Sequence, residues 1–213
     1  MKFSDPVLIA AIAGGASALA TFFLSAGAQD KPDLSVAHNF ETAVFAGGCF
    51  WCVEADFDKV DGVVKTTSGY TGGMSSNPTY YSHPKEGHLE AVQVTYDPEE
   101  VSYAELVEYF MRHIDPTDDS GQFCDRGNNY TTAVFVGSDE ERQTVEAEFS
   151  EIEDAMLLPA PIATKIRDAT PFYAAEAKHQ DYYMKNSVHY KFYRQRCGRD
   201  ERISEVWSGG GNS

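Results

Sequence analysis

Basic residues are scarce in this sequence of 213 residues: 17 Lys and Arg stand against 33 Asp and Glu, which gives a formal net charge of −16 at pH 7. Binding to nucleic acid rests on neutralising phosphates with Lys and Arg, so this balance argues against a nucleic-acid partner. A solvated, soluble surface explains the acidity. The length and the 42% of apolar residues predict one domain that can bury a core without disulfides.

Metal-binding patterns are also lacking. The chain has four cysteines, and the pair Cys49-x-x-Cys52 is followed by neither a second Cys-x-x-Cys nor a His-x-x-x-His. A zinc site is therefore disfavoured, and we expect neither a metal nor another cofactor. The spacing of His88, His179 and His189 is irregular, so we expect these histidines to be solvated or to lie on helix surfaces.

Residues 7–28 form an uncharged run of small and apolar side chains, and the small residues at 26–28 fit a signal-peptidase site before Gln29. An uncleaved membrane anchor is the alternative, because the run approaches the roughly 20 residues that a spanning helix needs. In either case we expect export, to the periplasm or to a membrane anchor that faces it. We therefore expect residues 1–28 to be a leader, 29–41 a linker, 42–207 the main domain and 208–213 a flexible tail.

The apolar side chains of 42–207 recur with the periods of interleaved strands and helices. Ser102-x-x-Glu105 and Ser138-x-x-Glu141 are capping boxes that predict two helix starts, and a third helix is expected after Gly48. We expect strands at 42–46, 63–70, 90–96, 131–136 and 162–166, and inward-facing side chains that include Phe50, Val53, Phe57, Phe110, Val145, Ile152 and Met156. This order predicts an α/β (α+β) fold: a two-layer, ferredoxin-like sandwich with a mixed sheet, followed by an irregular, partly helical C-terminal segment.

Cys49 follows two glycines at the point where an apolar strand turns into a helix. Free N–H groups and the macrodipole at a helix N-terminus favour a thiolate, so we expect Cys49 to be an ionised nucleophile. Phe50 and Trp51 could supply an apolar wall for a small substrate. Cys52 forms a Cys-x-x-Cys motif with Cys49, so a redox pair of the thioredoxin type is an alternative interpretation.

Glu90 lies on the same strand face as Val92, Val94 and Tyr96, which predicts a carboxyl on the core side of the sheet. Burial raises the pKa of a carboxyl, so Glu90 could remain protonated near neutrality and act as a hydrogen-bond donor or acid. The alternative is that Glu90 reaches water at the end of the strand.

The order of the motifs gives a closer interpretation. The strings GGCFWCVE, GYTGG, NPTY, GHLEAVQVTYDP, HIDPTD, CDRGNNYTTAVF, HQDYY and YKFYRQRCGRD span nearly everything after the leader. Together they closely resemble the peptide methionine-(S)-sulfoxide reductases of the A class, whose fold is an α/β sandwich with a mixed sheet. The resemblance implies Cys49 as the nucleophile, Glu90 as the acid, and Phe50, Trp51, Tyr80, Asp125 and Tyr130 as substrate-binding residues.

The resemblance also implies the reaction. The Cys49 thiolate attacks the sulfur of methionine-S-sulfoxide, free or in proteins, while Glu90 donates to the oxygen, and Cys49 becomes a sulfenic acid. We expect Cys197 to resolve it as a Cys49–Cys197 disulfide, with Cys52 as the alternative resolving residue. A thioredoxin-like dithiol then reduces the disulfide. Cys124 is expected to be a free thiol or a relay thiol, and the protein a monomer.

Two other functions stay open on the residues alone. An exported thiol–disulfide oxidoreductase would use Cys49 and Cys52, but it would require a thioredoxin-like fold with a cis-Pro loop. A non-enzymatic binding module would use Trp51 and the tyrosines to hold an apolar ligand. Replacement of Cys49 by Ser would abolish turnover in either enzyme and leave ligand binding nearly unchanged in the module.

Overall fold

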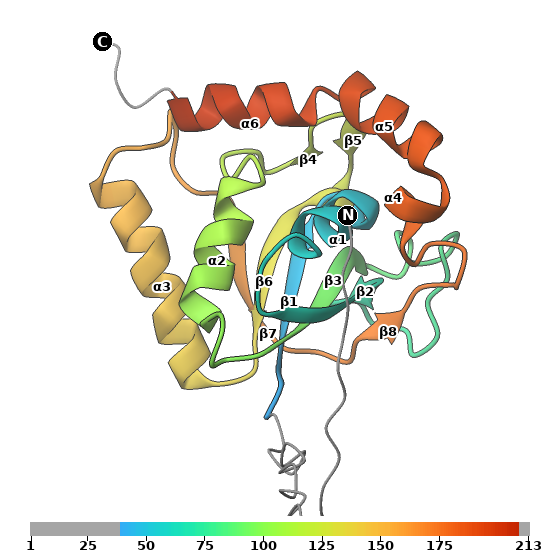
Figure 1. Cartoon of the computed structure of the whole chain (residues 1–213), viewed down its shortest axis with the longest axis horizontal. Helices are drawn as coiled ribbons and strands as arrows, with labels where there is room; N and C mark the ends of the chain where they lie inside the picture. The colour runs from blue at the N-terminus through green and yellow to red at the C-terminus, as the bar shows by residue number, and fades with distance from the viewer. Residues whose placement is uncertain (1–38, 209–213) are drawn as a thin grey trace, which may run out of the picture. The chain divides into compact units, whose positions relative to one another are not determined.

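The computed structural model describes residues 39–208, which form a six-stranded mixed sheet with helices packed against it (Figure 1). The strand order is β7-β6-β1-β3-β2-β8. Strands β1, β3, β2 and β8 pair antiparallel, as do β1 and β6, whereas β6 and β7 run parallel. The strands are β1 Glu41–Gly47, β2 Val63–Thr71, β3 Leu89–Tyr96, β6 Thr132–Val136, β7 Lys165–Asp168 and β8 Tyr173–Ala174.

The centre of the sheet is a pair of split βαβ units. Helix α1 (Phe50–Phe57) connects β1 to β2, and helix α2 (Tyr103–Arg112) connects β3 to β6. In both units a third strand lies between the two connected strands, so the central order β6-β1-β3-β2 is that of a ferredoxin-like sandwich. The predicted fold class is confirmed, and β7 and β8 extend the sheet at its edges.

Helices α1 and α2 cover one face of the sheet, and α3 (Asp139–Asp154) packs beside α2 (Figure 1). The core between them is aromatic: the ring of Phe45 on β1 lies 4.9 Å from Phe57 of α1 and 5.0 Å from Phe110 of α2, centroid to centroid. The predicted capping box is present at α2, where Ser102 and Glu105 bond each other's backbone N–H. At α3 Ser138 caps Glu141, but the Glu141 carboxylate accepts from Gly137 instead.

One prediction about the later chain is wrong. Met156 is 76% exposed, because α3 ends at Asp154 and Met156 takes a positive φ that turns the chain away. The C-terminal segment is partly helical, as predicted, with helices α4 (Tyr182–Lys185), α5 (Ser187–Arg196) and α6 (Arg199–Ser208). A two-stranded hairpin, β4 (Gly121–Gln122) and β5 (Asp125–Arg126), lies near α5 (Figure 1).

The predicted leader, all but the last residues of the linker, and most of the predicted tail lie outside the described residues. Within residues 39–208, no helix has both the length and the apolar character needed to cross a membrane.

Candidate active site

A tight turn between β1 and α1 places Cys49. Gly48 has a φ of +80°, and a Cβ there would lie 2.6 Å from the Cβ of Gln122, so this position requires glycine. Cys49 follows as the N-cap residue of α1. The turn therefore holds the Cys49 sulfur at the start of a helix and close to the chain around Gln122.

Cys49 lines a cavity of about 60 Å³. By comparison, one water molecule takes up about 30 Å³ of liquid, so the space is small and suits a compact group. Residues from five separated stretches of the chain meet there, including all five predicted substrate-binding residues. The lining residues are Cys49, Phe50, Trp51, Tyr80, Glu90, Asp125, Tyr130 and Tyr193.

Glu90 faces this cavity from β3 and is only 2% exposed. The N–H of Phe50 donates to Glu90 Oε2 over 3.1 Å, which ties the carboxyl to the first turn of α1. Burial raises the pKa of Glu90 to about 8, against the opposing effect of the hydrogen bonds from Phe50 and Tyr130. Near neutrality Glu90 is therefore mostly a neutral acid, and the alternative of a carboxyl in water does not apply.

The surroundings of Cys49 oppose the predicted thiolate. Burial raises the pKa of the Cys49 thiol well above its usual range, and the hydrogen bond with Cys52 adds to the effect. The side chain of Cys49 makes no capping hydrogen bond to the helix N–H groups, so the helix N-terminus does not compensate for lost hydration. Conversely, the hydrogen bond with Cys49 and the charges of Arg199 and Arg194 lower the pKa of Cys52.

The phenols of Tyr80 and Tyr130 and the rings of Phe50 and Trp51 complete the cavity wall. Burial raises the pKa of Tyr80 to about 12 and also raises that of Tyr130, so both phenols keep their protons and can donate. The indole of Trp51 stacks on Tyr182 with a ring-centroid distance of 3.8 Å, which fixes its orientation. Phe50 and Trp51 supply apolar surface beside donors, as a substrate with a methyl group and a polar oxygen requires.

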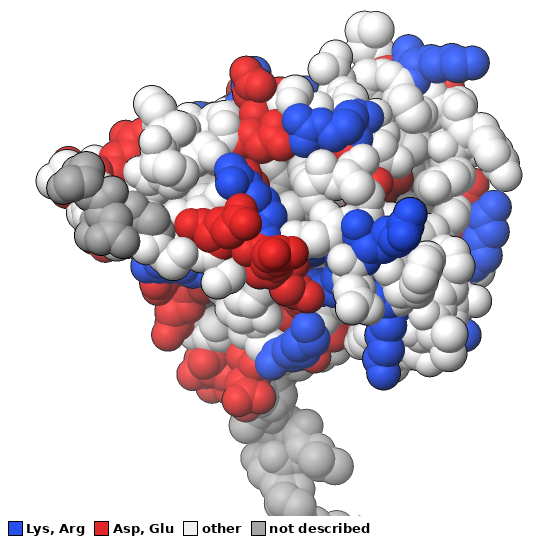
Figure 2. Space-filling view, turned by 90° about the horizontal axis from the view of Figure 1, so that it is seen from above, with Lys and Arg blue, Asp and Glu red and all other residues white. Residues whose placement is uncertain are grey.

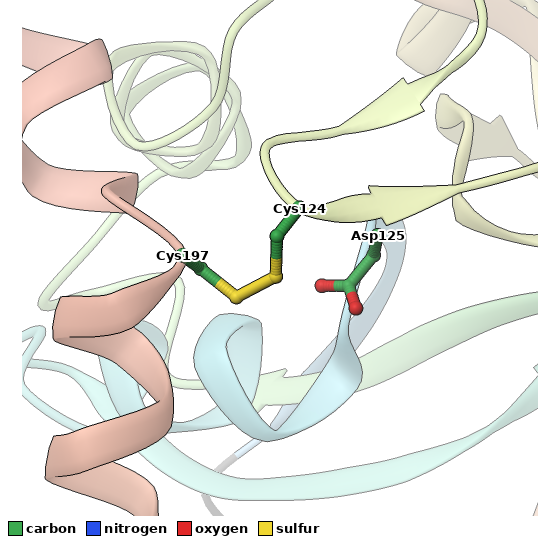
Figure 3. Close-up of side chains that lie close together, drawn as sticks. All are labelled: Cys124, Asp125 and Cys197. Carbon is green, nitrogen blue, oxygen red and sulfur yellow. A yellow bond between two sulfur atoms is a disulfide. The ribbon is translucent and has the colours of Figure 1, made fainter.

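A disulfide joins Cys124 to Cys197 beside this cavity (Figure 3). It connects the β4–β5 hairpin to the end of α5, and the carboxylate of the adjacent Asp125 lines the cavity. Cys124 is therefore not a free thiol in this state, in which Cys197 is bonded to Cys124 and not to Cys49. The alternative that Cys124 is a relay thiol stays a prediction. Cys49 and Cys52 are free and buried.

Cys124, Asp125 and Cys197 also place three potential metal-ligand atoms within 4.8 Å of one another. Metal binding by cysteine requires thiolates, and both sulfurs are committed to the disulfide. In this oxidised state the group therefore offers a metal a single carboxylate.

A buried ionic cluster holds the C-terminal helices onto α1. The Asp56 carboxylate accepts from Arg194 over 3.0 Å and lies 3.8 Å from Nε of Arg199. Asp56 and Arg199 are each about 2% exposed. Arg199 also donates to the backbone carbonyls of Gly47 and His113. The two arginines flank Cys197 in the sequence, so this cluster anchors the segment that carries Cys197.

Sequence reasoning missed three residues at the site. The Tyr193 hydroxyl donates to Asp125 and hydrogen-bonds with Cys49, and its position one helical turn before Cys197 was the available signal. His179 is buried and stacks on Tyr80, with 4.4 Å between the ring centroids. His88 is buried as well, so the predicted solvated positions of both histidines are wrong. His83 Nε2 lies 3.9 Å from Glu90 Oε1. Burial lowers the pKa of His83, so this contact joins two neutral groups near neutrality.

Comparisons with known proteins agree with this geometry. A family model described as peptide methionine sulfoxide reductase matches residues 41–210. Peptide methionine sulfoxide reductase MsrA 2 of Rhizobium meliloti (strain 1021) is 50% identical over 165 residues, which cover 78% of this chain and 82% of that protein. MsrA of Bacillus subtilis (strain 168) is 47% identical over 169 residues, which cover 78% of this chain and 96% of that protein.

Two solved structures share the fold. Methionine sulfoxide reductase A of Corynebacterium diphtheriae matches with a TM-score of 0.61 and 33% identity, over 70% of this chain and 76% of that one. Mxr1 from Saccharomyces cerevisiae in its reduced form matches with a TM-score of 0.64 and 30% identity, over 70% of this chain and 86% of that one. The chain belongs to the peptide methionine sulfoxide reductase family, and it is an oxidoreductase that reduces methionine sulfoxide.

Proposed function

We propose that the enzyme reduces the S epimer of methionine sulfoxide, free and in proteins, by attack of Cys49 on the sulfoxide sulfur. The observation that carries this proposal is the shared cavity of Cys49 and the neutral acid Glu90. A sulfoxide sulfur is a poor electrophile until its oxygen is protonated or strongly hydrogen-bonded. Nucleophile and acid must therefore act on the same molecule together.

In the first step Glu90 donates its proton to the sulfoxide oxygen, and Tyr80 and Tyr130 hydrogen-bond to the same oxygen. The Cys49 sulfur attacks the sulfoxide sulfur, and the oxygen passes to Cys49. The proton that the Cys49 thiol loses replaces the one given by Glu90. Methionine leaves, reduced by two electrons, and Cys49 becomes a sulfenic acid. Cys52, whose sulfur hydrogen-bonds with that of Cys49, can hold the thiol proton during the attack.

In the second step the Cys197 thiol attacks the sulfenic acid, which forms a Cys49–Cys197 disulfide and releases water. Cys124 then attacks Cys197, expels the Cys49 thiol and leaves a Cys124–Cys197 disulfide. Two neighbours support this order: Tyr193, one turn before Cys197, hydrogen-bonds with Cys49, and Asp125 lies next to Cys124 in the cavity wall. A thioredoxin-like dithiol reduces the final disulfide.

Cys52 remains the alternative resolving residue, because it is buried beside Cys49 and one helical turn away. Mass mapping decides between the two. The enzyme is reduced, freed of reductant and given one equivalent of sulfoxide. A Cys49–Cys52 disulfide as the first product would replace Cys197 by Cys52 in the scheme.

The test of the reaction uses separated R and S epimers of methionine sulfoxide with dithiothreitol as reductant. The proposal expects turnover of the S form alone, and loss of turnover in Cys49→Ser. Turnover of both epimers, or activity in Cys49→Ser, would contradict it.

We also propose that the enzyme is exported, acts as a monomer and repairs oxidised exported proteins. The support for export is the apolar run at 7–28 with small residues at 26–28. Fractionation of cells, with N-terminal sequencing of the mature enzyme, tests it. A cytoplasmic enzyme that retains Met1 would contradict export.

A further inference from the structure

We propose that the exposed face of α5, beside the Cys124–Cys197 disulfide, is the docking surface for an acidic dithiol protein that reduces this disulfide. The inference rests on the proposed function, because it names the site and the chemistry of the partner that resets the enzyme. It adds the residues that such a partner contacts.

The position of the disulfide makes a docking surface necessary. Cys124 is exposed and Cys197 is half-buried, whereas Cys49 and Cys52 are buried under α5. An external dithiol can therefore reach the Cys124–Cys197 pair without opening the fold. Exchange requires the attacking thiolate to approach the sulfur directly, so the partner must sit against the surface around Cys124 and the end of α5.

The outer face of α5 carries apolar side chains that do not pack into the core. Val188 is 83% exposed and Phe192 is 64% exposed, and the two lie one helical turn apart. With a rise of 1.5 Å per residue, Phe192 lies about 7.5 Å and Val188 about 13.5 Å along the helix from Cys197. Both distances fit within the contact area of a small protein, which is about 800 Å² for each partner in a standard interface.

The same face carries unpaired positive charge. Between Lys178 and Arg199 the chain has six basic residues and one acidic residue, in a protein with a net charge of −16. Four of the six have partners or lie elsewhere on the surface: Lys185 pairs with Asp181, Arg194 and Arg199 contact Asp56, and Lys178 lies over the rings of Tyr80 and Tyr81. Lys191 and Arg196 are exposed and have no ion pair among residues 39–208.

Helical geometry brings these features together. At about 100° per residue, Val188, Lys191, Phe192 and Arg196 fall within an arc of about 140°, on the side of α5 away from the buried Tyr190. Figure 2 shows Lys and Arg side chains among uncharged ones on the side where α4 and α5 lie, while Asp and Glu gather toward the other side. An acidic partner is thus repelled by most of the protein and attracted to the helix that ends at Cys197.

The reduction proceeds through a mixed disulfide between the partner and Cys124. A partner thiolate attacks Sγ of the exposed Cys124, forms a mixed disulfide and expels Cys197 as a thiolate that takes up a proton. The second partner thiol attacks the mixed disulfide and releases Cys124. The partner loses two electrons and two protons and becomes a disulfide, and the enzyme gains two thiols, one of which is the resolving Cys197.

The experiment compares two reductants for the same turnover of methionine-S-sulfoxide. One is dithiothreitol, which is small and uncharged, and the other is a bacterial thioredoxin kept reduced by its reductase and NADPH. The variants are Phe192→Glu and the pair Lys191→Glu with Arg196→Glu. The matched controls are Met156→Glu and Lys165→Glu, at two exposed residues outside α5, of which Lys165 lies on the edge strand β7.

The proposal expects both α5 variants to raise KM for thioredoxin at least tenfold, while turnover with dithiothreitol and both controls stay within twofold of the wild type. Raising NaCl from 50 to 300 mM should raise KM for thioredoxin in the wild type and much less in the charge variant. An unchanged KM for thioredoxin in the α5 variants, or an equal loss with both reductants, overturns the docking site. If wild-type enzyme fails with dithiothreitol, the proposed reaction fails instead.

Discussion

The burial of Glu90 has a consequence for stability that can be measured without substrate. Replacing Glu90 by Gln keeps the shape of the side chain and removes its titration. A carboxyl whose pKa is raised by folding binds its proton more tightly in the folded state. The stability that this proton supplies is fully present below the pKa of the unfolded chain and is lost as pH rises through the folded pKa.

The magnitude follows from the pKa values. The pKa of Glu90 rises from a usual value of 4.5 to about 8. Between these values the folded state holds one more proton than the unfolded state, so the free energy of unfolding falls by about 1.4 kcal/mol per pH unit. Relative to Glu90→Gln, the wild type should therefore lose about 3.5 kcal/mol between pH 5 and pH 8.

Urea denaturation of both proteins at half-unit steps from pH 5 to 8.5 measures this difference, with the Cys124–Cys197 disulfide kept oxidised. Other titrating groups are common to both proteins and cancel in the difference. A difference that stays constant across this range would show that Glu90 titrates as it does in water, and the acid role would lose its basis.

Three further predictions follow from the site. Glu90→Ala should lower the rate of methionine release in a single turnover by about 10²–10⁴-fold. Glu90→Gln should lose less, because its amide can still hydrogen-bond to the sulfoxide oxygen. Wild-type rates in Glu90→Ala would refute the acid role. In Cys124→Ser, one equivalent of sulfoxide should leave a Cys49–Cys197 disulfide, read by mass mapping of peptides, and a free Cys197 would contradict the scheme. Asp56→Asn should destabilise the protein by about 3–5 kcal/mol in urea, because it leaves two arginines without their buried partner, while the exposed Asp61→Asn should change little.

The central fold could be predicted because its signals are local. The alternation at 90–96 placed Glu90 on the core face, and the structure agrees, since Glu90, Val92 and Val94 are all buried. The capping residue Ser102 fixed the start of α2 to the residue. Both signals depend on neighbours within a few positions, which a sequence displays directly.

The parts that could not be predicted depend on contacts between distant residues. The Cys124–Cys197 disulfide joins residues 73 positions apart, and its pairing depends on how α5 folds back over α1. The same fold-back buries His179, for which the sequence predicts a solvated or helix-surface position. The helix start at Cys49 was correctly located, but the tyrosines of α4 and α5 exclude water from it, and this burial opposes the predicted thiolate.

The buried Asp56 carboxylate has a practical consequence for anyone who shortens the chain. A protein cut just before α5 would keep all six strands of the sheet, and its boundary would look reasonable from topology alone. It would also lose both guanidinium groups that contact Asp56, together with Tyr190 and Tyr193, which pack in one cluster with Cys49 and Cys52. Expression tags and fusion partners therefore belong after Ser208, because α5 and α6 supply the charges and aromatic rings that cover the buried groups of α1.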